Sequence, residues 1–213
     1  MRKMLMSLVL IWCSFSVTAE PITIAALGDS LTQGYGLQRQ DGFVPQLQRW
    51  LTDQGADVVL INAGVSGDTT TGGAARVDWT LTPDVDAMIV ALGGNDLLRG
   101  IDPGLSRDNI DAILGAGQRA GVAVLLVGIP APPNYGPEFK AAFDSIFPDL
   151  AEQYNTLLFP NFMAGIGDGN DPSKMLKYLQ NDGLHPNPEG VALIVAAMGP
   201  SVLELIERLK SGY

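Results

Sequence analysis

The chain contains a single cysteine and a single histidine among its 213 residues. Cys13 lies in an apolar N-terminal stretch, so the rest of the chain has no thiol and can form no disulfide. With one imidazole, a metal site would have to be built from carboxylates, and neither a His-rich cluster nor EF-hand spacing is present. The glycines at positions 93 and 94 also lack the Gly-x-Gly-x-x-Gly spacing of a dinucleotide site. We therefore expect neither a metal nor another cofactor.

Basic residues are few as well. The sequence has 13 Lys and Arg against 23 Asp and Glu, a formal net charge of −10, and no segment gathers the positive charges into a patch. A surface of this sign repels polyanions, so nucleic acid and anionic bilayers are not expected as partners. We expect a monomer that acts on a small molecule.

The N-terminus has the pattern of a secretory signal peptide. Arg2 and Lys3 form a positive start, residues 5–17 are almost wholly apolar, and Val17 and Ala19 are the small residues of a cleavage site. The alternative is a retained membrane anchor, but this run is shorter than the roughly 20 apolar residues of a spanning helix. We expect cleavage after Ala19, export to the periplasm or the medium, and no stable membrane anchor afterwards.

Two kinds of segment alternate along the remaining chain. Strands buried on both faces are predicted by the apolar, β-branched runs at residues 22–27, 58–61, 87–92, 122–129 and 156–159. Helices are predicted by apolar periodicity at residues 43–53, 69–79, 106–119, 138–154 and 188–209. Alternation of this kind predicts a parallel sheet covered by helices on both faces, and the length favours one domain, residues 20–213, over two.

The polar residues with catalytic potential follow these strands. Ser30 follows the first strand where it gives way to a loop or helix start, Gly64 and Gly67 follow the second, and Asn95 follows the third. The loop 181–186, Asn-Asp-Gly-Leu-His-Pro, comes after the fifth. Ligands of open α/β sheets bind beyond the carboxyl ends of the strands, so we expect these groups to converge at one edge.

Each of these groups has a chemical role in acyl transfer. A serine hydroxyl such as that of Ser30 becomes nucleophilic when a base accepts its proton, which His185 would do with Asp182 fixing its tautomer. Attack on an ester creates an oxyanion that requires donors placed around it. The backbone N–H of Ser30, a glycine N–H in the segment 64–67 and the amide of Asn95 could supply them.

Four ordered blocks of the sequence resemble those of the GDSL, or SGNH, hydrolases. They are Gly-Asp-Ser-Leu at 28–31, Asn62 to Thr70 with Ser-Gly-Asp-Thr at 66–69, Gly-Gly-Asn-Asp at 93–96 and Asp-Gly-Leu-His-Pro at 182–186. Asn-Tyr-Gly at 134–136 and Ile-Phe-Pro at 146–148 are similar to the exported bacterial arylesterases and multifunctional thioesterase I/lysophospholipase enzymes. The likeness spans nearly all of the chain after the signal.

The resemblance implies a three-layer α/β/α sandwich with a five-stranded parallel sheet, flavodoxin-like in topology. It also implies a catalytic triad of Ser30, His185 and Asp182, and an oxyanion hole formed by Ser30, Gly67 and Asn95. Gly67 is preferred over Gly64 because the Ser-Gly-Asp-Thr segment matches that branch. The implied enzyme is an exported serine esterase for aryl or alkyl esters, with lysophospholipids and thioesters as further candidates.

Taken singly, each block also has an ordinary structural interpretation. Gly28-Asp29-Ser30 could be a strand-to-turn signal, Asp182 could cap the last helix, and Gly-Gly-Asn-Asp at 93–96 could be a tight turn with an N-cap. Asp29 and Asp96 are both predicted to be structural, holding loops through backbone hydrogen bonds. Four such blocks in the right order favour the catalytic interpretation.

The substrate is less constrained than the chemistry. Ile129, Pro130 and Tyr135, in a proline-stiffened loop after the fourth strand, are predicted to line the acyl site, although a rigid connection without ligand contact is the alternative. A carbohydrate O-deacetylase would use the same catalytic groups with a different pocket. A binding module without activity is the alternative from another functional class.

Overall fold

The computed structural model describes residues 20–167 and 175–212, so the expected signal segment lies outside the described residues. Five strands are present: β1 (Ile22–Gly28), β2 (Val58–Gly64), β3 (Ala87–Ala91), β4 (Ala123–Val127) and β5 (Leu157–Phe159). The α-helices are α1 (Ser30–Gln33), α2 (Phe43–Asp53), α3 (Thr70–Thr80), α4 (Gly94–Arg99), α5 (Pro103–Ala120), α6 (Pro137–Asp144), α7 (Ile146–Gln153) and α9 (Pro188–Lys210). All five predicted strands are confirmed, with ends that differ by up to three residues.

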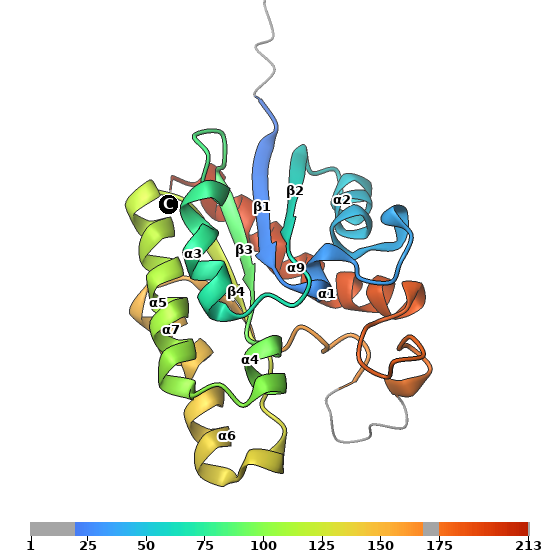
Figure 1. The fold of residues 1–213 in the computed structure, drawn as a ribbon. Coiled ribbons are helices and arrows are strands. Elements are labelled where there is room, and N and C mark those ends of the chain that lie inside the picture. Colours follow the sequence, from blue (N-terminus) through green and yellow to red (C-terminus); the bar gives the residue numbers. More distant parts are fainter. Residues whose placement is uncertain (1–19, 168–174, 213) are drawn as a thin grey trace, which may run out of the picture.

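The strands form one parallel sheet in the order β2-β1-β3-β4-β5. This is the flavodoxin-like order of a doubly wound sheet, in which the direction of winding changes between β1 and β3. Ligands bind beside this switch point, at the carboxyl ends of the strands. In Figure 1 that edge is the lower one, where α1 and α4 follow β1 and β3.

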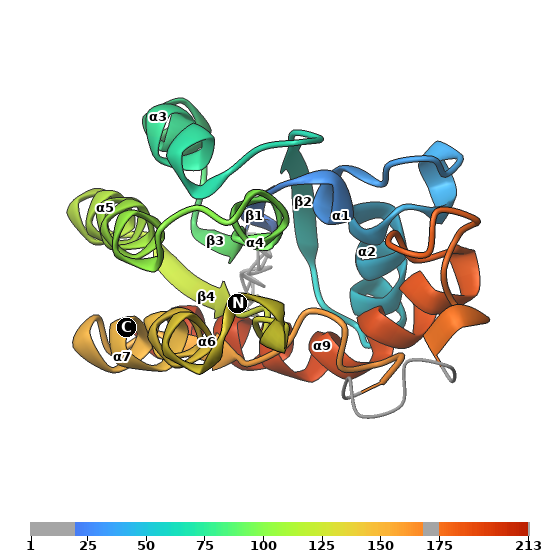
Figure 2. The same ribbon diagram turned by 60° about the horizontal axis from the view of Figure 1, so that its bottom comes forward.

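Helices cover both faces of the sheet, as predicted. Figure 2 shows α3 and α5 on one side and α9 on the other. Alternate residues of each central strand enter the two cores: Ile24 and Ala26 face α2 and α9, whereas Ala25 and Leu27 face α3 and α5. The apolar, β-branched sequence of the central strands is therefore explained by burial on both sides.

The helix predicted at 138–154 is two helices, so that prediction was wrong in detail. α6 ends at Asp144 and α7 begins at Ile146. Pro148 lies in the first turn of α7, and its ring would clash with the carbonyl of residue i−4 in a continuous helix. That residue is Asp144, where α6 ends, so the proline accounts for the break.

β2 also departs from the prediction, because it is not buried on both faces. Val58 is buried, but Val59 and Ile61 are exposed. Its position beside β1 alone leaves one side without a neighbouring strand. The apolar run gives no information on its place in the sheet order.

Within the described residues, α9 is the one helix long and apolar enough to cross a membrane, judged by length and composition. Half of its apolar window is buried inside the protein, and the helix packs on α2, β4 and β5. The predicted apolar face is confirmed, with Val191, Ile194 and Met198 buried. Its hydropathy is thus explained by its place in the core.

Candidate active site

Ser30 is the first residue of α1, directly after the carboxyl end of β1. The side chain of Asp29 caps this short helix by accepting a hydrogen bond from the Leu31 N–H at 3.0 Å. Gly64 lets β2 approach closely, because a Cβ there would lie 2.4 Å from the Gln33 nitrogen. The backbone around Ser30 is therefore fixed by the ends of β1 and β2.

Arg76 of α3 connects the same strand ends. Its guanidinium donates to the Gly28 carbonyl at 2.9 Å and to the Ala63 carbonyl at 2.7 Å, and it forms an ion pair with Asp68 at 2.7 Å. One side chain thereby bonds to the last carbonyl of β1 and the penultimate carbonyl of β2, and its ion pair with Asp68 anchors the loop that follows β2. A planar guanidinium with five donors suits this task, whereas a lysine would not.

Asp182 and His185 lie on one tight turn before α9. Asp182 Oδ1 accepts hydrogen bonds from the N–H groups of Leu184 at 2.9 Å and His185 at 3.0 Å. Gln180 holds the turn to the chain after α1 by donating to the Tyr35 carbonyl at 2.8 Å. The cap of α9 is Asn187, whose side chain accepts from the Gly190 N–H, so Asp182 is not a helix cap.

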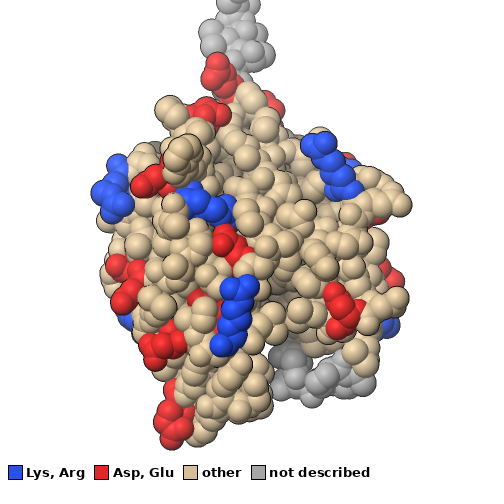
Figure 3. Space-filling model, in the orientation of Figure 1, with Lys and Arg blue, Asp and Glu red and all other residues tan. Residues whose placement is uncertain are grey.

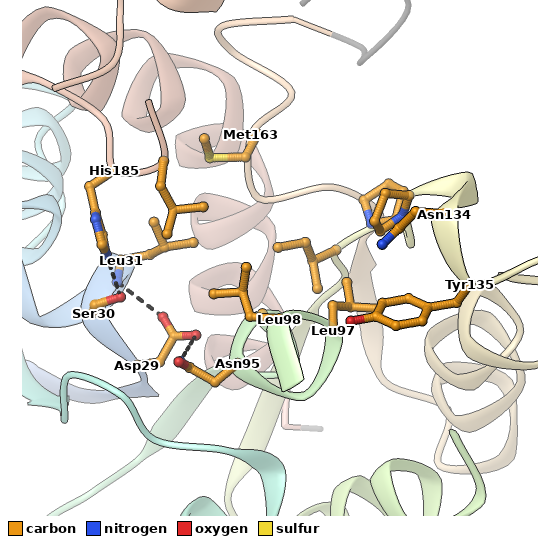
Figure 4. A pocket seen from close by; sticks show the side chains of 15 residues that line it. Asp29, Ser30, Leu31, Asn95, Leu97, Leu98, Asn134, Tyr135, Met163 and His185 are labelled. Carbon is orange, nitrogen blue, oxygen red and sulfur yellow. Dashed lines mark hydrogen bonds between the residues drawn. The ribbon is translucent and has the colours of Figure 1, made fainter. Parts of the chain in front are cut away.

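A hydrogen-bonded chain joins the two sequence-distant loops. Asp182 Oδ2 lies 2.7 Å from His185 Nδ1, and His185 Nε2 lies 2.9 Å from Ser30 Oγ. An ionised carboxylate only accepts, so Nδ1 carries the proton and Nε2 is left to accept from the Ser30 hydroxyl. Figure 4 shows His185 directed at Ser30. The arrangement has the connectivity of a nucleophile, a base and an orienting acid.

Hydrogen bonding stabilises the charged form of Asp182. The N–H of Leu184, the imidazole of His185 and the N–H of His185 together lower the pKa of this carboxyl from 3.8 to about 2. Asp182 is therefore ionised throughout the neutral range. It can hold the imidazole in one tautomer and would stabilise the imidazolium when a proton arrives.

Asn95, at the start of α4, is brought to the same edge by the turn Gly93-Gly94. Its Nδ2 donates to Asp29 Oδ2 at 3.2 Å (Figure 4). The segment 93–96 is a helix start, and Gly93 occupies the N-cap position with φ +116°. The block taken alone was interpreted as a tight turn with an N-cap; the N-cap is present, at Gly93, and its positive φ explains the glycine.

Asp96 is structural, as predicted, but acts through more than the backbone. It is fully buried and accepts from the Thr70 N–H at 2.9 Å, the Thr70 hydroxyl at 2.5 Å and the Ser106 hydroxyl at 2.9 Å. Three donors compensate the burial of this side chain. They tie α4, and with it Asn95, to α3 and α5.

The two candidate glycines differ in environment. The Gly64 N–H donates to Asn62 Oδ1 at 3.0 Å, whereas within residues 20–167 and 175–212 no hydrogen bond occupies the Gly67 N–H. Gly67 has φ +82°, and its carbonyl accepts from Arg99 of α4 at 2.8 Å. Gly67 is not among the residues lining the cavity described next.

A cavity of about 350 Å³ opens beside Ser30. Ser30, Asn95 and His185 stand at one end and Asn134 and Tyr135 at the other (Figure 4). Ile129, Pro130 and Tyr135, which the sequence predicted at this site, all line the cavity. Most of the other lining residues are apolar: Leu31, Leu97, Leu98, Pro132, Met163 and Leu184. Of these, Leu97, Leu98 and Met163 were not singled out from the sequence.

Tyr35 is a further residue that the sequence did not reveal. Its ring lies against the imidazole of His185, with centroids 4.7 Å apart and planes tilted by 39°. Only the tertiary fold brings the chain after α1 to the turn before α9. No local pattern at Tyr35 indicates this contact.

Among the described residues, no group of three or more His, Cys, Asp or Glu side chains could hold a metal ion. The basic side chains on the face in Figure 3 lie apart from one another, with acidic groups between them.

Comparison with known proteins agrees with this geometry. Residues 26–193 match the model of the GDSL-like Lipase/Acylhydrolase family. Esterase TesA of Pseudomonas aeruginosa is 37% identical over 87% of this chain and 90% of its own length. An arylesterase of Vibrio mimicus is 35% identical over 87% and 90% of the two chains. Thioesterase 1/protease 1/lysophospholipase L1 of Escherichia coli is 32% identical over 86% and 85%.

Solved structures agree as well. Psychrotrophic esterase EstA from Pseudoalteromonas sp. superposes with a TM-score of 0.78 at 36% identity, covering 87% of this chain and 98% of that one. The resemblance inferred from the four sequence blocks is thus confirmed. So is the three-layer α/β/α fold with a five-stranded parallel sheet.

Proposed function

The chain belongs to the GDSL-like lipase/acylhydrolase family and, like the esterase and the arylesterase that it matches, is a carboxylic ester hydrolase. We propose that it works as a serine esterase. Ser30 is the nucleophile, His185 the general base and acid, and Asp182 the residue that orients His185. The observation that carries this assignment is the unbroken chain Asp182–His185–Ser30, at 2.7 and 2.9 Å, at one end of an apolar cavity.

The proposed reaction has two halves. In the first, Ser30 Oγ attacks the ester carbonyl while His185 Nε2 accepts its proton, and the tetrahedral intermediate collapses as the same proton passes to the departing alcohol. In the second, His185 deprotonates a water that attacks the acyl-enzyme, and Ser30 Oγ leaves as the hydroxyl. The products are an alcohol and a carboxylic acid, and no electrons are exchanged with a cofactor.

The oxyanion of both intermediates requires hydrogen-bond donors. We assign this role to the Ser30 N–H, the Gly67 N–H and Asn95 Nδ2. The choice of Gly67 over Gly64 is supported by the hydrogen bond that already occupies the Gly64 N–H. The choice of Asn95 is supported by its place in the cavity wall beside Ser30.

The shape of the cavity favours acyl chains longer than acetyl. Its wall is formed largely by aliphatic side chains and prolines, and it extends away from Ser30 toward Tyr135 (Figure 4). An acetyl group would leave most of this space unused, which argues against a carbohydrate O-deacetylase. Aryl and alkyl esters with medium acyl chains, and lysophospholipids or thioesters of similar shape, are the proposed substrates.

Export is part of the proposal. The basic start, the apolar run and the small residues Val17 and Ala19 support cleavage after Ala19. Since β1 begins at Ile22, this cleavage leaves the whole sheet in the domain of residues 20–213. N-terminal sequencing of protein recovered outside the cytoplasm checks it, and an intact N-terminus there would contradict it.

The experiment compares Ser30→Ala with Ser66→Ala on an aryl ester. Both are serines at the same edge of the sheet, but the Ser66 hydroxyl donates to Gln33 Oε1 at 3.0 Å, whereas the His185 ring is hydrogen-bonded to Asp182 and Ser30. Ser30→Ala should lose about 10⁴-fold or more in kcat, the usual cost of removing a member of a triad. Ser66→Ala should stay within a few-fold of the original enzyme. Retention of activity by Ser30→Ala would refute the assignment.

A further inference from the structure

Asp29 uses its two carboxylate oxygens for two different partners. Oδ1 accepts from the Leu31 N–H at 3.0 Å and so caps α1. Oδ2 accepts from Asn95 Nδ2 at 3.2 Å, across 66 residues of sequence. A cap alone needs one oxygen, and serine or asparagine would provide it. The second oxygen therefore has a function that capping does not explain.

That function follows from the asymmetry of an amide. The Asn95 side chain has an NH₂ group with two donors and a carbonyl oxygen that only accepts. An ionised Asp29 accepts but cannot donate, so it selects the orientation in which the NH₂ group faces it. One N–H then bonds to Asp29, and the second remains for an oxyanion on the Ser30 side. A flipped amide would present an oxygen to the developing negative charge.

We propose that Asp29 is a positioning residue for the esterase reaction, whose carboxylate fixes the Asn95 amide with its NH₂ group toward the oxyanion. The inference rests on the proposed function, in which Asn95 is an oxyanion donor. Asp29 does not contact the reacting atoms in this scheme, because it acts through Asn95. The two residues form one unit whose effects on kcat are not additive.

The electrostatics of Asp29 make this role depend on pH. The side chain is only 3% exposed, and burial raises its pKa from 3.8 to about 6, against the opposing hydrogen bonds of Leu31 and Asn95. His185, from the turn before α9, lowers this pKa, and Asp68, from the loop before α3, raises it. Below pH 6 the protonated carboxyl can donate, and it no longer requires the NH₂ orientation of Asn95.

The test separates capping from positioning with three variants. Asp29→Ser keeps a side-chain oxygen for the Leu31 N–H but removes the acceptor for Asn95. Asn95→Ala removes the donor itself, and the double variant completes the cycle. Thermal unfolding and circular dichroism report on folding. If Asp29→Ser does not fold, Asp29→Asn replaces it. The amide of asparagine has one oxygen atom in place of two, so it can accept from the Leu31 N–H but leaves no second oxygen for Asn95 Nδ2.

Asn95→Ala should lower kcat by about 10² to 10³-fold with little change in KM. Asp29→Ser should lower kcat by about 10- to 100-fold with KM nearly constant, and should change kcat less than twofold in the Asn95→Ala background. If Asp29→Ser lowers kcat equally with Asn95 present and in the Asn95→Ala background, or lowers it in neither, the positioning role of Asp29 is overturned while the proposed function stands. An unchanged kcat in Asn95→Ala would overturn the oxyanion assignment of the proposed function and Asp29 with it.

A pH series gives an independent readout. Dividing kcat of the original enzyme by kcat of Asn95→Ala cancels the pH dependence that His185 gives to both enzymes. This ratio should fall by about tenfold as the pH is lowered from 7 to 5, through the pKa of about 6 of Asp29. A ratio that stays constant across this range would contradict the role of the Asp29 charge.

Discussion

Leu98 should set how strongly the enzyme prefers longer acyl chains. It lies in the wall of the cavity between Ser30 and Tyr135 (Figure 4), and its side chain is 59% exposed. A methylene group that becomes buried contributes up to about 0.8 kcal/mol, which is about fourfold in kcat/KM. We therefore expect kcat/KM of the original enzyme to rise from acetyl to medium-chain aryl esters and then to level off where the cavity ends.

The substitution Leu98→Ala removes part of the cavity wall along the proposed path of the acyl chain. If about two methylenes lose their contact, at up to about 0.8 kcal/mol each, kcat/KM for an octanoyl ester falls by up to about 15-fold, or about 1.6 kcal/mol. The acetyl ester, which does not reach this part of the cavity, should stay within about twofold. Because Leu98 is largely exposed, the midpoint of thermal unfolding should change little.

Leu105→Ala is the matched control. Leu105 lies on α5, is 48% exposed and is not part of the cavity wall. The assay is kcat/KM for aryl esters of two to twelve carbons with the three proteins. An octanoyl-to-acetyl ratio that is the same in Leu98→Ala and the original enzyme would refute the acyl path. A sharp maximum at acetyl with hydrolysis of acetylated sugars would favour the deacetylase.

Three further predictions concern the scaffold of the site. Arg76→Ala should lower the free energy of unfolding by about 3–5 kcal/mol, because charge-assisted hydrogen bonds to two strand ends and an ion pair with Asp68 are lost together. Urea unfolding measures it, and a loss under 1 kcal/mol would contradict this role of Arg76. Acid should destabilise the protein through Asp182, because the pKa of this carboxyl is about 2 in the folded protein and 3.8 in the unfolded chain. Its contribution to the free energy of unfolding is therefore complete above about pH 4 and is lost as the pH falls toward 2. Unfolding measured from pH 5 to 2 should show a shallower decline for Asp182→Asn, and identical slopes would exclude the contribution. Tyr35→Ala should lower kcat by a few-fold because His185 loses its ring contact, whereas Tyr35→Phe should keep it; equal losses in both would assign the effect to the hydroxyl.

The fold was largely predictable because the central strands are buried on both faces. β1, β3 and β4 appear in the sequence as uninterrupted apolar runs, and α2 and α5 each carry an apolar period. The order of the strands depends on pairing between distant segments, which no local pattern encodes, and it followed from the family resemblance. The apolar run of β2 also predicted burial on both faces, although Val59 and Ile61 are exposed.

The candidate site was predictable where chemistry is concentrated in local motifs. Ser30 and the turn from Asp182 to His185 each stand in a short block at the end of a strand or before a helix. Tyr35 and Gln180 were not found, because their roles depend on a contact between segments 145 residues apart. Asp29 was predicted to be structural from its own block. Its bond to Asn95 required the three-dimensional arrangement of β1 and β3.

Covalent labelling of the nucleophile tests the central claim most directly. An alkyl phosphonate p-nitrophenyl ester phosphonylates an activated serine: a bond forms between the serine Oγ and phosphorus, and p-nitrophenolate leaves. Incubation of this protein with such a reagent, followed by intact mass and peptide analysis, should show one phosphonyl group per chain, located on Ser30, and none in the Ser30→Ala variant. Labelling of another residue such as Ser66 with Ser30 unmodified, or full activity after complete labelling, would contradict the account.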